Sequence, residues 1–95
     1  MMKITFDWDP KKASANLRKH GVGFDEASTV FGDTLSVAIP DPDHALHEER
    51  FVIVGTSASQ RLLVVVHTVI GERIRLISAR KATKHEKNVY QETRL

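Results

Sequence analysis

The segment that decides the fold is residues 50–78, with the sequence RFVIVGTSASQRLLVVVHTVIGERIRLIS. It contains two runs, Phe51–Val54 and Leu62–Val66, that are apolar at every position, which is typical of central strands covered on both faces. Turn-forming residues separate the runs, so neighbouring strands are close enough to pair as hairpins. The segment therefore predicts the centre of a largely antiparallel sheet, with strands at Arg50–Thr56, Arg61–Thr68 and Glu72–Ser78.

Residues on both sides of this segment complete the expected fold. Asp9 and Pro10 are a typical N-cap and first helical residue, and Gly21 is a typical C-cap, so a helix is expected up to about His20. The last helix has a poor apolar stripe and should dock weakly. The order β-α-α-β-β-β-β-α predicts an α+β fold, in which the remaining elements are a strand at Lys3–Phe6, a helix at Phe24–Phe31, a strand at Thr34–Ile39 and a helix at Ala79–Glu92.

Length and composition indicate a single domain over residues 1–95. Hydrophobic residues make up 41 % of the chain and charged residues 27 %, which is typical of a globular protein. The absence of cysteine excludes disulfides, thiol nucleophiles and cysteine-ligated zinc. The start of the chain lacks the apolar core of a signal peptide, and no apolar run approaches membrane-spanning length. A cytoplasmic protein with no membrane partner is therefore expected.

Charge is distributed unevenly along the chain. Residues 1–20 hold five Lys or Arg against two Asp, and residues 72–95 hold seven Lys or Arg against three Glu. Residues 21–71 hold only two Arg against seven Asp or Glu. Two basic ends thus flank an acidic middle, and if the ends meet in space they form a patch suited to a polyanion. The alternative is that these side chains only solvate helix faces.

An arginine series near the end of the chain is the first candidate site. Arg73 and Arg75 share one face of a strand, because side chains alternate along it, and Arg80 and Lys81 follow. Two guanidinium groups on one face suit bidentate contacts with phosphate. An ordinary solvated strand paired with Glu48 or Glu49 is the alternative.

His67 is a second candidate, since a histidine near a phosphodiester can act as general acid or base. Its face depends on the hairpin register. A two-residue loop at Ile70-Gly71 turns it away from the arginines, and a three-residue loop at Val69–Gly71 pairs it with Arg73. A half-buried strand histidine without a catalytic role fits the sequence equally well.

Two further groups of residues are candidates for binding a ligand. Residues 41–49 combine two histidines with four carboxylates, but no standard metal-ligand spacing is present, and Glu49 can instead hold Arg50. We therefore predict no metal and no cofactor. On the first helix, Lys12 and Lys19 share a stripe near Trp8, an arrangement that can hold single-stranded nucleic acid through charge and stacking. Trp8 can equally be a core residue.

Three motifs, spread from Phe6 to Tyr90, resemble the BrnT toxin family. They occur in the family's order and spacing without a large insertion. The residues that carry the resemblance are Phe6, Asp7, Trp8, Asp9, Lys12, Asn16, Lys19, His20, Gly21, Val22, Phe24, Glu26 and Ala27, then Glu49, Arg50 and Gly55, and then residues 73–82 with Glu86 and Tyr90.

This resemblance implies a toxin of a type II toxin–antitoxin pair with a RelE-like fold. Such toxins cut RNA without metal and inhibit translation. The implied partner is a BrnA-like antitoxin with a DNA-binding domain, in a heterotetramer that contacts operator DNA only through the antitoxin.

The implied reaction is transesterification of an RNA phosphodiester, which needs a base, positive donors and a proton source. The donors expected are Arg73, Arg75 and Arg80, with Glu49 or His67 as base. The residues expected to bind RNA are Trp8, Lys12, Lys19, Arg50 and Lys81. Of these, Lys12, Lys19 or Lys81 would hold the substrate or supply the proton. Two alternatives remain, a catalytically inactive module that binds the antitoxin and acts as corepressor, and a basic DNA-binding domain.

Overall fold

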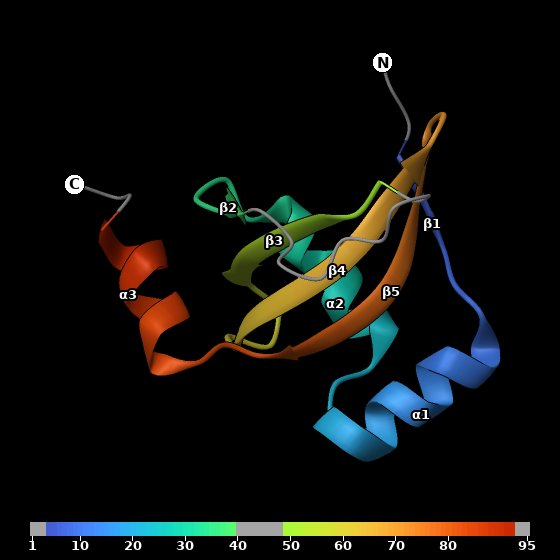
Figure 1. The fold of residues 1–95 in the computed structure, drawn as a ribbon, viewed down its shortest axis with the longest axis horizontal. Helices are drawn as coiled ribbons and strands as arrows, with labels where there is room; N and C mark the ends of the chain where they lie inside the picture. The colour runs from blue at the N-terminus through green and yellow to red at the C-terminus, as the bar shows by residue number, and fades with distance from the viewer. Residues whose placement is uncertain (1–3, 40–48, 93–95) are drawn as a thin grey trace.

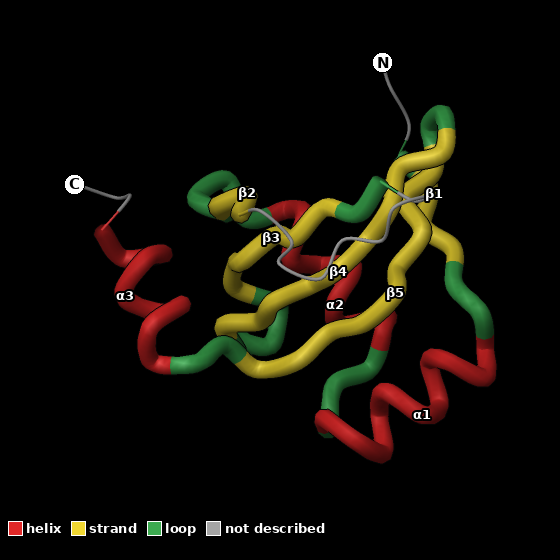
Figure 2. Tube along the Cα trace, in the orientation of Figure 1, coloured by secondary structure: helices red, strands yellow, loops and turns green. Residues whose placement is uncertain are grey.

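A computed structural model describes residues 4–39 and 49–92 of the chain. Five strands form one sheet, and helices lie on both of its sides (Figures 1 and 2). No helix within the described residues is both long and apolar enough to cross a membrane. In chain order the elements are β1 (Thr5–Asp7), α1 (Pro10–His20), α2 (Phe24–Ser28), the 3-10 helix η1 (Thr29–Gly32), β2 (Val37–Ile39), β3 (Phe51–Thr56), β4 (Leu62–Ile70), β5 (Arg73–Lys81) and α3 (Lys84–Glu92).

The sheet is mixed, with strand order β1-β5-β4-β3-β2. Strands β2 to β5 form the predicted antiparallel series, but β1 lies parallel to β5, with Asp7 opposite Arg75. The expectation of a largely antiparallel sheet was therefore wrong. The parallel pairing joins residues 68 positions apart, as in the pair Thr5 and Arg73. No short turn connects the two strands, so no local sequence signal predicts that they pair.

The first helix begins and ends where the sequence predicts. The carboxylate of Asp9 accepts a hydrogen bond from the backbone N–H of Lys11 at 2.9 Å, and Pro10 is the first helical residue. Gly21 adopts a left-handed conformation with φ +69°, which a glycine tolerates without strain, and its N–H bonds the carbonyl of Leu17. These local signals fix the position of α1 in the chain.

The second helix is shorter than predicted. In place of one helix over Phe24–Phe31, an α-helix ends at Ser28 and a 3-10 helix follows. Ser28 and Thr29 donate their hydroxyl protons to the carbonyls of Asp25 and Glu26, at 2.7 and 2.6 Å. Such side-chain bonds to the preceding turn compete with the regular helical ladder.

Two apolar clusters cover the two faces of the sheet. The face packed against α1 and α2, which we call the α2 face, carries Phe24, Leu63, Val65 and Leu76. The opposite face, which we call the α3 face, carries a second cluster of Val52, Val54, Val64 and Tyr90. Helix α3 reaches this face mainly through the buried ring of Tyr90, whose hydroxyl donates to Asp33 at 2.7 Å. One residue thus contributes much of the docking of the last helix.

The C-terminal boundary also differs from the prediction. Strand β5 continues to Lys81 because Ala79, Arg80 and Lys81 pair with β4, and α3 begins only at Lys84. Thr83 and Glu86 form a capping box there, with the Thr83 N–H donating to Glu86 at 2.8 Å and the Glu86 N–H donating to Thr83 at 3.2 Å. The helix predicted from Ala79 therefore starts five residues later.

Candidate functional site

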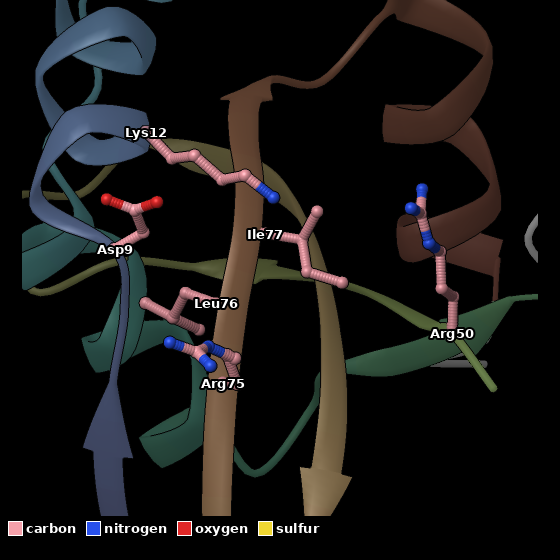
Figure 3. Close-up of a pocket in the computed structure, with 6 residues that line it drawn as sticks. All are labelled: Asp9, Lys12, Arg50, Arg75, Leu76 and Ile77. Atoms are coloured by element: carbon pink, nitrogen blue, oxygen red, sulfur yellow. The ribbon is translucent and has the colours of Figure 1, made fainter. Parts of the chain in front are cut away.

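A pocket of about 230 Å³ lies beside β5, where β1 has ended and α1 approaches (Figure 3). Figure 3 shows the Lys12 side chain extending from α1 across β5 toward Ile77. Three cationic side chains and one carboxylate line the pocket, and Figure 3 shows Arg50 on the far side of Ile77 from Asp9, Lys12 and Arg75. The lining residues are Asp9, Lys12, Arg50, Arg75, Leu76 and Ile77.

A β-bulge in β5 shapes this pocket. Ser78 pairs with Val66 while Leu76 pairs with His67, so Ile77 is an extra residue between two paired positions. The bulge residue itself lines the pocket. Because an extra residue shifts the alternation of side chains, Arg75 and Arg80 both face the α3 side although they are five positions apart.

Buried Asn16 sets the position of Lys12. Its amide group donates to the carbonyls of Val22 and Ala79 at 2.9 and 2.8 Å, and its oxygen accepts from the Ala79 N–H at 3.1 Å. Both the nitrogen and the oxygen of the Asn16 amide are thus hydrogen-bonded, as is usual for a buried polar group. Helix α1, with Lys12 one turn earlier, is therefore fixed to β5.

Arg73 and Arg75 lie side by side, as predicted, and both approach Asp7. Arg73 Nη1 donates to Asp7 Oδ2 at 3.3 Å, and Arg75 Nε lies 3.8 Å from Asp7 Oδ1. Arg75 lines the pocket, but Arg73 does not. The sequence marks Asp7 as a family motif residue and Asp9 as a motif residue and N-cap, but it does not place them near the arginines. The nearness of Asp7 arises from the parallel β1–β5 pairing.

Arg80 has a different environment from the one predicted. It donates to both carboxylate oxygens of Glu86 on α3, at 2.8 and 2.7 Å, and it does not line the pocket. This pairing lowers the pKa of Glu86 to about 2, because the guanidinium stabilises the carboxylate. In this structure Arg80 joins the last strand to the last helix.

His67 lies on the opposite face of the sheet from Arg75 and Arg80. The hairpin loop is Gly71-Glu72 and not Ile70-Gly71 or Val69–Gly71, and His67 pairs with Leu76 on the α2 face. The ring is buried edge-on against Phe31, with centroids 4.8 Å apart. Burial lowers the pKa of His67, which favours the neutral imidazole.

The other predicted residues are dispersed. Trp8 packs edge-on against Phe24 in the core, with ring centroids 6.0 Å apart. Lys19 and Lys81 are exposed and do not line the pocket, and Lys81 lies opposite Leu63 on the α2 face. Glu49 is exposed and directly precedes Arg50, which does line the pocket.

The candidate metal loop, residues 41–49, lies outside the described residues except for Glu49. Within residues 4–39 and 49–92, no three His, Asp or Glu side chains gather in a way that would hold a metal ion.

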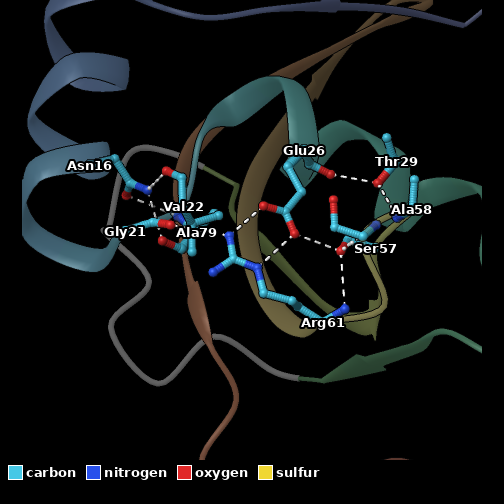
Figure 4. A network of polar contacts seen from close by, with 10 residues as sticks. Asn16, Gly21, Val22, Glu26, Thr29, Ser57, Ala58, Arg61 and Ala79 are labelled. Carbon is cyan, nitrogen blue, oxygen red and sulfur yellow. Dashed lines mark hydrogen bonds and ion pairs between the residues drawn. The ribbon is translucent and has the colours of Figure 1, made fainter.

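A second polar network, which the sequence did not predict, joins α2 to the β3–β4 hairpin (Figure 4). Arg61 donates from Nε to Glu26 at 2.9 Å, forms an ion pair with the same carboxylate, and also donates to the carbonyl of Gly21 at 3.1 Å. Ser57 donates to Glu26 at 2.7 Å. The bonds from Arg61 lower the pKa of Glu26. The Glu26 carboxylate is hydrogen-bonded by both Arg61 and Ser57, which is typical of a polar network that stabilises the fold.

The protein has an α+β fold with a small pocket lined by three cationic side chains, and guanidinium and ammonium groups are the usual partners of phosphate in proteins. A family model described as "Ribonuclease toxin, BrnT, of type II toxin-antitoxin system" matches residues 8–86. The chain therefore belongs to the BrnT family of ribonuclease toxins, as the sequence motifs predicted. Membership in a type II toxin–antitoxin family implies an antitoxin protein as partner.

A solved structure supports the same fold. The crystal structure of the Brucella abortus ribonuclease toxin BrnT superposes with a TM-score of 0.67 and is 20 % identical in sequence. The match covers 86 % of this chain and 100 % of the Brucella chain. No curated protein matches the chain by sequence.

Proposed function

We propose that the chain is a metal-independent endoribonuclease and that the pocket beside β5 binds the scissile phosphate. The observation that supports this is that Lys12 on α1, Arg75 on β5 and Arg50, which directly precedes β3, line one pocket. Guanidinium and ammonium groups can neutralise a phosphodiester and the further negative charge that develops on it during cleavage. Arg73 adds positive charge beside Arg75, and we retain Arg80, Lys19, Lys81 and Trp8 as contributors to binding the longer RNA strand.

The reaction that we propose is a transesterification. The 2′-hydroxyl of a ribose loses its proton and its oxygen bonds to the neighbouring phosphorus, while the bond from phosphorus to the 5′-oxygen breaks. The products are a 2′,3′-cyclic phosphate and a 5′-hydroxyl that has gained a proton. Lys12 is the proposed proton donor for the leaving oxygen, because its ammonium group extends over the pocket from α1.

Two carboxylates are candidates for the base. The first is Glu49, the base predicted from the sequence, which directly precedes Arg50. The second is Asp9, which lines the pocket and caps α1. Glu49→Gln and Asp9→Asn separate them, since the general base is the residue whose neutral amide removes the cleavage step without weakening RNA binding.

For the biological setting we propose translation inhibition in the cytoplasm by a toxin with a RelE-like fold. A BrnA-like antitoxin with a DNA-binding domain would neutralise it in a heterotetramer and would contact operator DNA. The BrnT family assignment supports a proteinaceous antitoxin, and the apolar α3 face, which α3 reaches through Tyr90, supports a protein contact there.

Purified wild-type protein and an RNA oligonucleotide test the proposal in the presence of EDTA. We expect cleavage to a 2′,3′-cyclic phosphate, and no cleavage of the same oligonucleotide with 2′-deoxyribose throughout. Binding to the antitoxin without any RNA cleavage would instead indicate the inactive, corepressor module. Salt-dependent binding of duplex DNA by the isolated chain would indicate a DNA-binding domain.

A further inference from the structure

We propose that Asp7 is a positioning residue that holds the Nε edge of Arg75, so that the two Nη groups of Arg75 face the substrate phosphate. This inference rests on the proposed ribonuclease function. It concerns a residue that does not line the pocket itself and that would act only through Arg75.

Backbone pairing brings the two residues together. Asp7 is the last residue of β1 and lies directly opposite Arg75 in the parallel ladder, so their side chains share one face. Arg75 Nε lies 3.8 Å from Asp7 Oδ1. This is an ion-pair distance, longer than a hydrogen bond. A carboxylate placed at the Nε edge leaves the two Nη groups of Arg75, which lines the pocket, for a second partner.

The two carboxylate oxygens of Asp7 have different partners. Oδ2 accepts a hydrogen bond from Arg73 at 3.3 Å, which fixes the carboxylate from the outer side. Oδ1 is buried and accepts no hydrogen bond from the described residues. A buried carboxylate oxygen without a hydrogen bond is costly, so it favours the approach of Arg75 and selects one orientation of its guanidinium.

Stability alone does not explain this cluster. The side chains of Asp7, Arg75 and Arg73 are 34 %, 46 % and 55 % exposed, and ion pairs at such exposure contribute little to folding. The carboxylate also reduces the positive charge next to the pocket, which weakens attraction for RNA. Removing its charge should therefore act on RNA binding and RNA cleavage in opposite directions.

Asp7→Asn tests this with the full chain. We expect the cleavage rate at saturating RNA to fall by about tenfold to a hundredfold, because a catalytic cation is displaced from its productive position. The dissociation constant for an uncleavable 2′-O-methyl RNA should stay the same or decrease, and the urea midpoint of unfolding should not change. Asp7→Glu, which keeps a carboxylate, should recover part of the rate.

Asp25→Asn is the matched control, because it removes the same charge from an exposed position on α2 and should change none of these values. If Asp7→Asn cleaves at the wild-type rate, or loses binding and cleavage in parallel, the positioning role is wrong while wild-type cleavage still supports the proposed function. If the wild type does not cleave RNA, the proposed function fails, and the NMR signal of the Arg75 Nε–H decides the positioning role separately. An Arg75 signal that is protected from exchange in the wild type and lost in Asp7→Asn supports that role, and an unchanged signal contradicts it.

Discussion

Arg80 and Glu86 form a two-bond ion pair that joins the end of β5 to the first turn of α3. The same Glu86 carboxylate also accepts a hydrogen bond from the backbone N–H of Thr83, so one side chain caps the helix and attaches it to the sheet. Since Tyr90 provides the second attachment, through Asp33, the last helix is held at two points. The weak apolar stripe of α3 is compensated by polar contacts.

Glu86→Gln should lower the free energy of unfolding by about 1–2 kcal/mol at pH 7, after allowance for the exposure of Arg80. The pKa of Glu86 is lowered from 4.5 to about 2 in the folded chain. A lowered carboxylate pKa contributes stability that is present above pH 4.5 and is lost as the pH falls to about 2. Urea unfolding from pH 7 to pH 2 checks this, because the difference between variant and wild type should nearly vanish at the acid end. A difference that is constant with pH would contradict the pairing.

Gly55→Ala should destabilise the chain by about 1–3 kcal/mol. A Cβ at this position would lie 2.8 Å from Val30 Cγ1 and 3.1 Å from Ser36 Cβ, so β3 and η1 would have to separate. Gly32→Ala is the matched control, because its Cβ would have no neighbour within 4 Å and its φ is not in the left-handed region. Thermal unfolding of the two variants checks the expectation. Equal losses of stability would show that the close packing around Gly55 does not exclude a Cβ.

Asn16→Ala should cost about 2–3 kcal/mol, because it leaves the backbone groups of Val22 and Ala79 without their buried partner. Asn16→Asp should cost at least as much, since a carboxylate cannot donate to the two carbonyls. Ser14→Ala, at an exposed position on the same helix, is the control. Chemical denaturation gives the values. A small loss in both Asn16 variants would show that α1 does not depend on this amide for its attachment.

His67→Leu should leave RNA cleavage intact, because the imidazole is buried on the α2 face and does not line the pocket. Burial lowers the pKa of His67 below 6.5, so the unfolded chain takes up the proton first as the pH falls. The wild type should therefore lose stability below about pH 6.5, and His67→Leu should lose less. Cleavage rates at pH 7 and unfolding curves from pH 7 to pH 5 test both statements. Abolished cleavage in a folded variant would restore His67 as a candidate base.

The parts of the fold that local chemistry determines could be predicted from the sequence. The cap residues Asp9 and Gly21 fixed α1, and apolar runs located the central strands, since each signal lies within a few residues of its effect. The start of α3 was missed although the Thr83 and Glu86 capping box was present in the sequence. The pairing of Arg80 with β4 overrode the helical pattern at that end.

Long-range pairing decided the remainder. The pocket brings together Lys12, Arg50 and Arg75, which had been predicted separately, but their meeting depends on the parallel β1–β5 ladder and on the bulge at Ile77. The face of His67 depended on the hairpin loop, which proved to be Gly71-Glu72. The face of Arg80 depended on the bulge, because an extra residue shifts the alternation of all later side chains in β5. Asp7 and Asp9 became candidates only through this arrangement.

Metal-free RNA cleavage by Arg75→Ala, compared with Arg18→Ala, tests the central claim most directly. Arg18 is an exposed arginine on α1 that does not line the pocket, so its removal lowers the net charge equally. We expect Arg75→Ala to lose roughly 10²–10³-fold in kcat/KM while remaining folded, as for the loss of one transition-state donor. Arg18→Ala should keep the wild-type value. Wild-type kcat/KM in a folded Arg75→Ala variant would contradict the assignment of this pocket as the site of RNA cleavage.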